Sequence, residues 1–292
     1  MINGNTQYRA GRSSGRAWHT IDPQPPESDL PMSAPVIPRP AATTLILRQG
    51  APGLEVLMVR RSMQASFMPG AYVFPGGGVD AQDGSSEHLA HCDEAEDLLQ
   101  RRIGQVMQVG DQAAAYAVGA LRECFEECGL WLGAADGAGP ADGWAGLRAR
   151  LNGGATMARL AADHGLRLGT RALQPWSHWV TPVGLPKRFD TLFFVAEAPA
   201  GQVPEVDAGE TTALAWVHPP EALAEQAQGR FQMEFATLRT VESLLPFARL
   251  GVAALLAHAA AHTSLPPLHP RLPRAAQGRI AGVLLPGPPG YD

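Results

Sequence analysis

Cysteine is scarce in this chain, whose 292 residues include only Cys92, Cys124 and Cys128. Three cysteines cannot supply a paired disulfide framework. Cys124 and Cys128 lie four residues apart, and we expect them to pack in a core, because tetrahedral zinc takes four ligands and no partner pair is evident. Free thiols are typical of a reducing compartment, so we expect a cytoplasmic protein.

Long apolar runs and a basic excess are also missing. No stretch approaches the roughly 18 apolar residues of a membrane span, and the N-terminus carries no apolar signal core, so we expect neither membrane insertion nor export. The net charge is −5, which argues against nucleic acid as a partner because its phosphates require a basic surface. A phosphorylated small molecule is still compatible, since a metal ion and local arginines can neutralise it. Nothing here specifies an oligomeric state.

Proline, serine, glycine and arginine dominate residues 1–40. Such a segment buries too little apolar surface to offset its ordering entropy, so we expect a disordered tail. Beyond it, strands are predicted at 42–48, 54–60, 71–74, 179–181, 191–196 and 212–217, the first two as a hairpin. Helices are predicted at 94–108, 112–128, 144–151, 155–164, from 221, 235–250 and 252–261. Asp111 is the expected N-cap of the second of these helices and Gly129 its stop.

This mixture of strands and helices predicts an α/β sandwich with a mixed sheet between helix layers. We expect a core domain over 41–220 and a helical C-terminal extension over 221–292 packed on it.

Carboxylates are concentrated in the segment Arg122–Leu130, where Glu123, Glu126 and Glu127 follow Arg122 directly. On a helix these three acids lie on neighbouring parts of one face, where like charges repel. A hard divalent cation removes that repulsion, because it takes oxygen ligands. A solvated acidic face is the alternative. The apolar flanks and the glycine loop Phe74–Asp80 upstream favour a packed helix beside a site of close backbone approach.

Together these residues resemble the signature of the Nudix hydrolases, G-x5-E-x7-R-E-U-x-E-E-x-G-U, where U is bulky and apolar. Gly77 fits the leading glycine, Asp83 stands at the first glutamate, and Arg122–Leu130 matches the second half. The arginine comes 31 residues later than the pattern requires, which corresponds to an insertion over 84–114. We expect the insertion to be a surface excursion that leaves the Nudix core intact, with the Gly77 backbone close to Glu123 and Glu127. The role of Asp83 stays open.

A second resemblance, covering roughly 41–220, is to the coenzyme A diphosphatases of the peroxisomal type, which also carry an insertion in the box. Leu57, Arg61–Ser62, Gly70 and Phe74–Gly77 keep the spacing of their signature, whereas Ser66 replaces its inner arginine and Val59 its threonine. Trp176–Pro182 and Arg188–Phe194 look similar as well.

The resemblance implies a Nudix fold and Mg²⁺ or Mn²⁺ as cofactor, bound by Glu123, Glu126, Glu127 and the carbonyl of Gly77. Arg122 is counted with the catalytic group as a brace for these carboxylates. The general base is Glu123 or Glu210, with Glu205 as a third candidate.

Arg60, Arg61, Arg188 and Phe189 are the candidate substrate contacts, with core packing as the alternative for Phe189. The implied activity is hydrolysis of a diphosphate link in a small nucleotide-type substrate, coenzyme A or an acyl-coenzyme A. Two alternatives remain: a Nudix enzyme for NADH or a nucleotide sugar, and a non-catalytic binding module.

Overall fold

The computed structural model describes residues 36–64, 69–134, 140–206, 211–272 and 285. The segment expected to be a tail lies outside this range up to residue 35, and the first strand begins at Arg39, inside the expected tail. The described strands are β1 (Arg39–Gln49), β2 (Leu54–Arg61), β3 (Tyr72–Val73), β4 (Gly76–Gly78), β5 (Gln174–Val180), β6 (Phe189–Glu197) and β7 (Thr211–Val217).

These strands form one mixed sheet. Its order is β3-β2-β1-β6-β5, with β4 paired to β1 and β7 to β2. Only the β1–β6 pair is parallel; the others, including the predicted β1–β2 hairpin, are antiparallel. The start of β1 pairs with β4 and its end with β2. The glycine strand β4 therefore occupies the place where β2 has diverged from β1.

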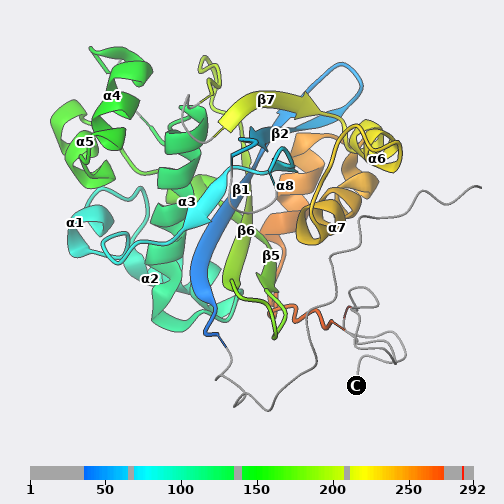
Figure 1. Cartoon of the computed structure of the whole chain (residues 1–292). Helices are drawn as coiled ribbons and strands as arrows, with labels where there is room; N and C mark the ends of the chain where they lie inside the picture. Colours follow the sequence, from blue (N-terminus) through cyan, green and yellow to red (C-terminus); the bar gives the residue numbers. More distant parts are fainter. Residues whose placement is uncertain (1–35, 65–68, 135–139, 207–210, 273–284, 286–292) are drawn as a thin grey trace, which may run out of the picture. The chain divides into compact units, whose positions relative to one another are not determined.

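Helices cover both faces of the sheet, α1 to α5 on one side and α6 to α8 on the other (Figure 1). They are α1 (Ser86–Leu89), α2 (Glu96–Leu99), α3 (Ala113–Cys128), α4 (Gly143–Asn152), α5 (Met157–His164), α6 (Pro219–Ala227), α7 (Phe235–Ser243) and α8 (Val252–Ala260). Short 3₁₀ turns occur at Gly110–Gln112, Thr170–Ala172 and Leu245–Phe247, and a π-helical turn at Gln100–Gln105. The α/β/α sandwich with a mixed sheet and a helical C-terminal region is thus confirmed.

Alternation along the strands divides the core into two layers. Ile46 packs on the face of α3, whereas Leu45 and Leu47 pack on the face of α7 and α8. Successive strand residues point to opposite faces, so a strand covered on both sides is apolar throughout. This explains the unbroken run Leu45–Leu47.

The central helix α3 ends where the sequence predicts. Gly129 adopts a φ of 70°, and its N–H donates to the carbonyl of Phe125 at 2.9 Å. The predicted start is wrong in detail. Asp111 lies in the 3₁₀ turn that precedes α3, and the N-cap is Gln112, without a side-chain cap bond. The 3₁₀ turn leads the chain into the helix and displaces the cap by one residue.

The C-terminal helices α6 to α8 supply the second layer. Val241, Leu244 and Leu255 are fully buried in the cluster that contains β1 and β6 side chains. Within the described residues, no single helix is long and apolar enough to cross a membrane. One pair, Phe235–Phe247 with Val252–Ala260, passes by length and composition together, with a bend of 110° between its halves.

The insertion over 84–114 is not the surface excursion that we expected. Cys92, Leu99, Ile103 and Met107 are 0–2% exposed and belong to the same core cluster as α3. Leu99, Ile103 and Met107 are spaced by four residues, which brings them to one side of a helical segment. The insertion therefore enlarges the core on this face.

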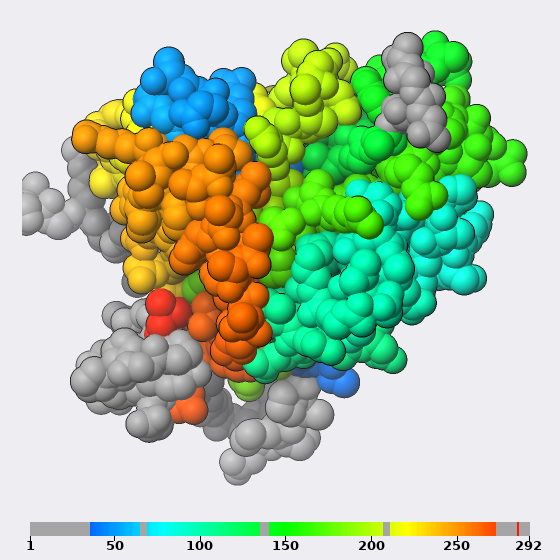
Figure 2. All heavy atoms as spheres, turned by 180° about the vertical axis from the view of Figure 1, so that it is seen from behind, coloured from blue at the N-terminus to red at the C-terminus, as the bar shows by residue number. Residues whose placement is uncertain are grey.

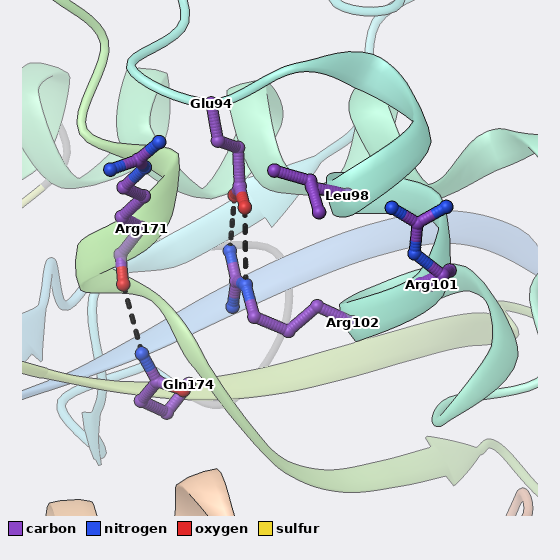
Figure 3. Close-up of a pocket in the computed structure, with 6 residues that line it drawn as sticks. All are labelled: Glu94, Leu98, Arg101, Arg102, Arg171 and Gln174. Atoms are coloured by element: carbon purple, nitrogen blue, oxygen red, sulfur yellow. Dashed lines mark hydrogen bonds and ion pairs between the residues drawn. The ribbon is translucent and has the colours of Figure 1, made fainter.

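Partly buried polar contacts fix the insertion to the segment before β5. Arg102 pairs with Glu94 and donates to the carbonyls of Thr170, at 2.7 Å, and Leu173. The pair lines a hollow of about 460 Å³. Figure 3 shows the pair with Arg171 on one side of it and Arg101 on the other. From behind, the insertion lies beside the chain that leaves α8 (Figure 2), where the Leu265 N–H donates to the Val106 carbonyl at 2.7 Å.

Two adjacent leucines test whether the insertion is part of the core. Leu99 is 1% exposed and Leu98 is 43% exposed. Leu99→Ala should lower the free energy of unfolding by about 2–5 kcal/mol, as for a buried leucine. Leu98→Ala, the matched control, should stay within about 0.5 kcal/mol of the wild type. Urea denaturation measures both. Equal, small effects at the two positions would mean that the insertion does not contribute to the core.

Candidate functional site

The two halves of the sequence signature meet at the C-terminal half of α3. A Cβ atom on Gly77 would lie 2.5 Å from Oε2 of Glu123, so the glycine backbone lies directly against this carboxylate. The N–H of Gly76 donates to Oε2 of Glu127 at 2.9 Å. The predicted closeness of Gly77 to Glu123 is confirmed, while Glu127 contacts the neighbouring glycine.

Asp83, which precedes the insertion, bonds the signature arginine that follows the insertion. Its carboxylate is fully buried and receives two N–H bonds from Arg122, Nε to Oδ1 at 3.1 Å and Nη2 to Oδ2 at 3.0 Å. Oδ2 also accepts the N–H of Asp80 at 2.8 Å. Asp83 thus anchors the arginine of the second half, and this answers the question that the sequence left open.

Arg122 is the centre of the cluster. Besides Asp83, its guanidinium donates to Oε1 of Glu123 at 2.9 Å, to Oε2 of Glu126 at 2.9 Å and to the carbonyl of Gly78 at 2.6 Å. Burial alone lowers the pKa of Arg122, but the bond to Asp83 and the charges of Glu123 and Glu126 raise it above its ordinary value. Arg122 therefore stays charged and braces the carboxylates, as predicted from its place in the signature.

Negative charge exceeds positive charge in this cluster. Burial raises the pKa of Glu123 to about 7, against the lowering effect of Arg122. Burial also raises the pKa of Glu126. The single guanidinium of Arg122 pairs with the carboxylates of Asp83, Glu123 and Glu126, so it does not compensate all three. Cys124 and Cys128 are fully buried in the core, as expected.

The donor set fits a divalent metal ion in its chemistry. Within the part of the chain that the structure describes, no three His, Cys, Asp or Glu side chains converge as a formed metal site. Glu123 and Glu126 are turned to Arg122, and Glu127 to the Gly76 amide. The oxygens nevertheless belong to one helix face beside a glycine loop, and hard oxygen donors suit Mg²⁺ and Mn²⁺.

Two of the candidate general bases, Glu210 and Glu205, lie between β6 and β7 in the sequence. Glu210 lies outside the described residues. Glu205 is exposed in the segment between β6 and β7. Its N–H donates to the carbonyl of Cys128 at 2.9 Å. It also lines a cavity of about 230 Å³, together with Gly129, Trp144 and Arg148.

Sequence reasoning missed Arg148, which is 8% exposed and bonds both this segment and α3. Its signal was a charged residue on the apolar face of α4, between the buried Leu147 and Leu151.

The candidate substrate contacts are spread over two places. Arg60 is exposed, with its guanidinium 5.9 Å from the Tyr72 ring centre, and Arg61 follows it in β2. Arg188 is buried and donates to the carbonyls of Thr181, at 3.0 Å, and Val36, at 2.7 Å. Phe189 begins β6. Arg188 thus holds chain segments together, and a substrate contact for any of the four stays a prediction.

Comparison with known proteins agrees with this geometry. The family model of the NUDT19 Nudix domain matches residues 33–114 and 99–234. The acyl-coenzyme A diphosphatase NUDT19 of Gallus gallus is 31% identical over 233 residues, which cover 62% of this chain and 61% of that protein. Its Homo sapiens counterpart is 30% identical over 213 residues, covering 59% of this chain and 55% of that protein. The chain thus spans less than two thirds of the length of these relatives.

A solved structure supports the fold. The crystal structure of a Nudix hydrolase from Alicyclobacillus acidocaldarius aligns with a TM-score of 0.60 and 27% identity, covering 78% of this chain and 98% of that one. The family model spans more than half of the chain and includes both halves of the interrupted signature. On this evidence the chain belongs to the Nudix hydrolases, in the family of the NUDT19 Nudix domain.

Proposed function

We propose that this protein hydrolyses the diphosphate link of coenzyme A or an acyl-coenzyme A with the aid of Mg²⁺ or Mn²⁺, releasing a nucleotide and a phosphopantetheine product. The observation that carries the proposal is the group of acids on α3, held by Arg122 beside the glycine strand β4. The relatives that match are named acyl-coenzyme A diphosphatases, which supports the substrate class.

Each residue of the cluster has a proposed task. Glu123, Glu126 and Glu127, with the carbonyl of Gly77, would hold the cation. When bound, a divalent cation supplies the positive charge that offsets the negative diphosphate oxygens and activates a water molecule. Arg122 keeps its bonds to Asp83 and so fixes the helix face from which the ligands project.

Hydrolysis itself combines the attack of water with a proton transfer. Water attacks one phosphorus, the bridging P–O bond breaks, and the proton of the water passes to a carboxylate within hydrogen-bonding reach. We assign this base to Glu123 or Glu210.

Glu127→Gln tests the metal-binding face. The amide oxygen of glutamine can still accept the Gly76 N–H, so the fold and Tm should be preserved. The loss of one anionic ligand should lower kcat by roughly two or more powers of ten. Glu221→Gln, on the exposed start of α6, is the matched control and should leave kcat unchanged. Near-normal turnover of Glu127→Gln at saturating Mg²⁺ would contradict the assigned site.

A substrate panel tests the chemistry at the level of specificity. We expect coenzyme A and its thioesters to be cleaved with a higher kcat/KM than NADH, ADP-ribose or nucleoside triphosphates, because discrimination is a difference in transition-state stabilisation. Product analysis with Mg²⁺ and with Mn²⁺ gives the values. A clear preference for NADH or a nucleotide sugar would retain the diphosphatase chemistry and refute the substrate class.

A further inference from the structure

Arg148 is a buried cation that bonds main-chain carbonyls. It lies on α4 and is 8% exposed. Its Nε and Nη2 donate to the carbonyl of Glu126 at 2.8 and 2.6 Å, and Nη1 donates to the carbonyls of Glu205 at 2.9 Å and Val206 at 3.2 Å. Each of its three nitrogens therefore has a main-chain acceptor.

These acceptors include groups that an α-helix leaves unpaired. The last four carbonyls of a helix have no partner within it. In α3 two of them belong to Glu126 and Cys128; the first accepts from Arg148 and the second from the N–H of Glu205. A cation at this end also interacts favourably with the helix dipole. Arg148 and Glu205 thus complete the last turn of α3.

A second set of bonds joins the same two segments. The side chain of Gln202 accepts the N–H of Trp131 at 2.9 Å and donates to its carbonyl at 3.0 Å. The segment between β6 and β7 is therefore attached to the end of α3 by Gln202 and Glu205, and Arg148 spans both.

The residues held in this way are adjacent to the site. The carbonyl that receives two N–H bonds belongs to Glu126, and Glu127 follows it.

We propose that Arg148 is a positioning residue: it fixes the last turn of α3 against the 201–206 segment and so determines where Glu126 and Glu127 present their carboxylates to the cation. The inference rests on the proposed function only in that these carboxylates bind a divalent metal ion. Residues outside the direct ligands that orient them commonly affect metal affinity by about 10- to 100-fold when replaced.

The test compares two arginines of one helix. Arg148→Met keeps the length of the side chain but removes every donor, while Arg150→Met removes an exposed arginine that pairs with Asp163 at 2.6 Å on the surface. Mn²⁺ binding is measured directly from the loss of the free Mn²⁺ signal in electron paramagnetic resonance. We expect the Kd of Arg148→Met to rise about 10-fold or more over the wild type, and that of Arg150→Met to be unchanged.

The Mn²⁺ dependence of activity gives a second readout, which a loss of folded protein would not change. Fewer folded molecules lower the apparent kcat but leave the half-saturating Mn²⁺ concentration as it is, whereas displaced ligands raise that concentration. If Arg148→Met does not fold, Arg148→Lys replaces it: one ammonium can serve the Glu126 carbonyl or the Glu205–Val206 carbonyls, so we expect an intermediate rise in Kd.

Equal Mn²⁺ affinity of the Arg148 and Arg150 variants would overturn the proposal. This failure is distinct from failure of the substrate proposal, which would be visible as a wild-type protein that binds Mn²⁺ but does not cleave coenzyme A. Weaker Mn²⁺ binding by Arg148→Met would support the positioning role in that case too. A wild-type protein without Mn²⁺ binding would overturn both.

Discussion

A single buried guanidinium holds the candidate site together. The guanidinium of Arg122 donates to Asp83, which precedes the insertion, and to Glu123 and Glu126 of its own helix. It also donates to the carbonyl of Gly78. Breaking one such buried pair would leave a charge without compensation, which is far more costly than losing a surface ion pair. The arrangement is nevertheless incomplete, because the one positive charge of Arg122 is opposed by the carboxylates of Asp83, Glu123 and Glu126. The unbalanced negative charge is the physical reason to expect a cation beside Arg122.

The same constraint explains how the signature survives an insertion. Asp83 and Arg122 are separated by the residues of two short helices, a π-helical turn and most of α3, yet their side chains form a two-bond ion pair. The insertion is itself anchored, by apolar side chains such as Leu99 and Ile103 in the core and by Arg102 at its surface. The insertion therefore ends close to where it begins. As a result β4 and α3 stay side by side, although the insertion separates them in the sequence.

The sequence alone predicted much of this arrangement. The order of the predicted strands and helices, the stop at Gly129 and the closeness of Gly77 to Glu123 follow from local patterns with strong physical causes. These are the hydrophobic period, a glycine in the left-handed conformation and the need for close approach. Strand β4 and helix α1 were not predicted. The start of α3 did not follow, because a 3₁₀ turn took the place of a cap at Asp111. The burial of the insertion was readable in the spacing of Leu99, Ile103 and Met107, but the survival of both halves of the signature on either side of it favoured a surface interpretation. Arg148 was missed because its acceptors are main-chain carbonyls from distant segments, so its place on the apolar face of α4 was the one sign of its role.

The central claim is that Arg122 and Asp83 hold Glu123, Glu126 and Glu127 ready for one divalent cation beside Gly77. Anomalous diffraction from a crystal of the protein with Mn²⁺ tests it most directly. The account predicts one manganese peak about 2–2.6 Å from carboxylate oxygens of Glu123 and Glu127, with the bonds between Arg122 and Asp83 preserved. A manganese peak at another place, or Glu123 and Glu126 still closed on Arg122 at saturating Mn²⁺, would contradict it.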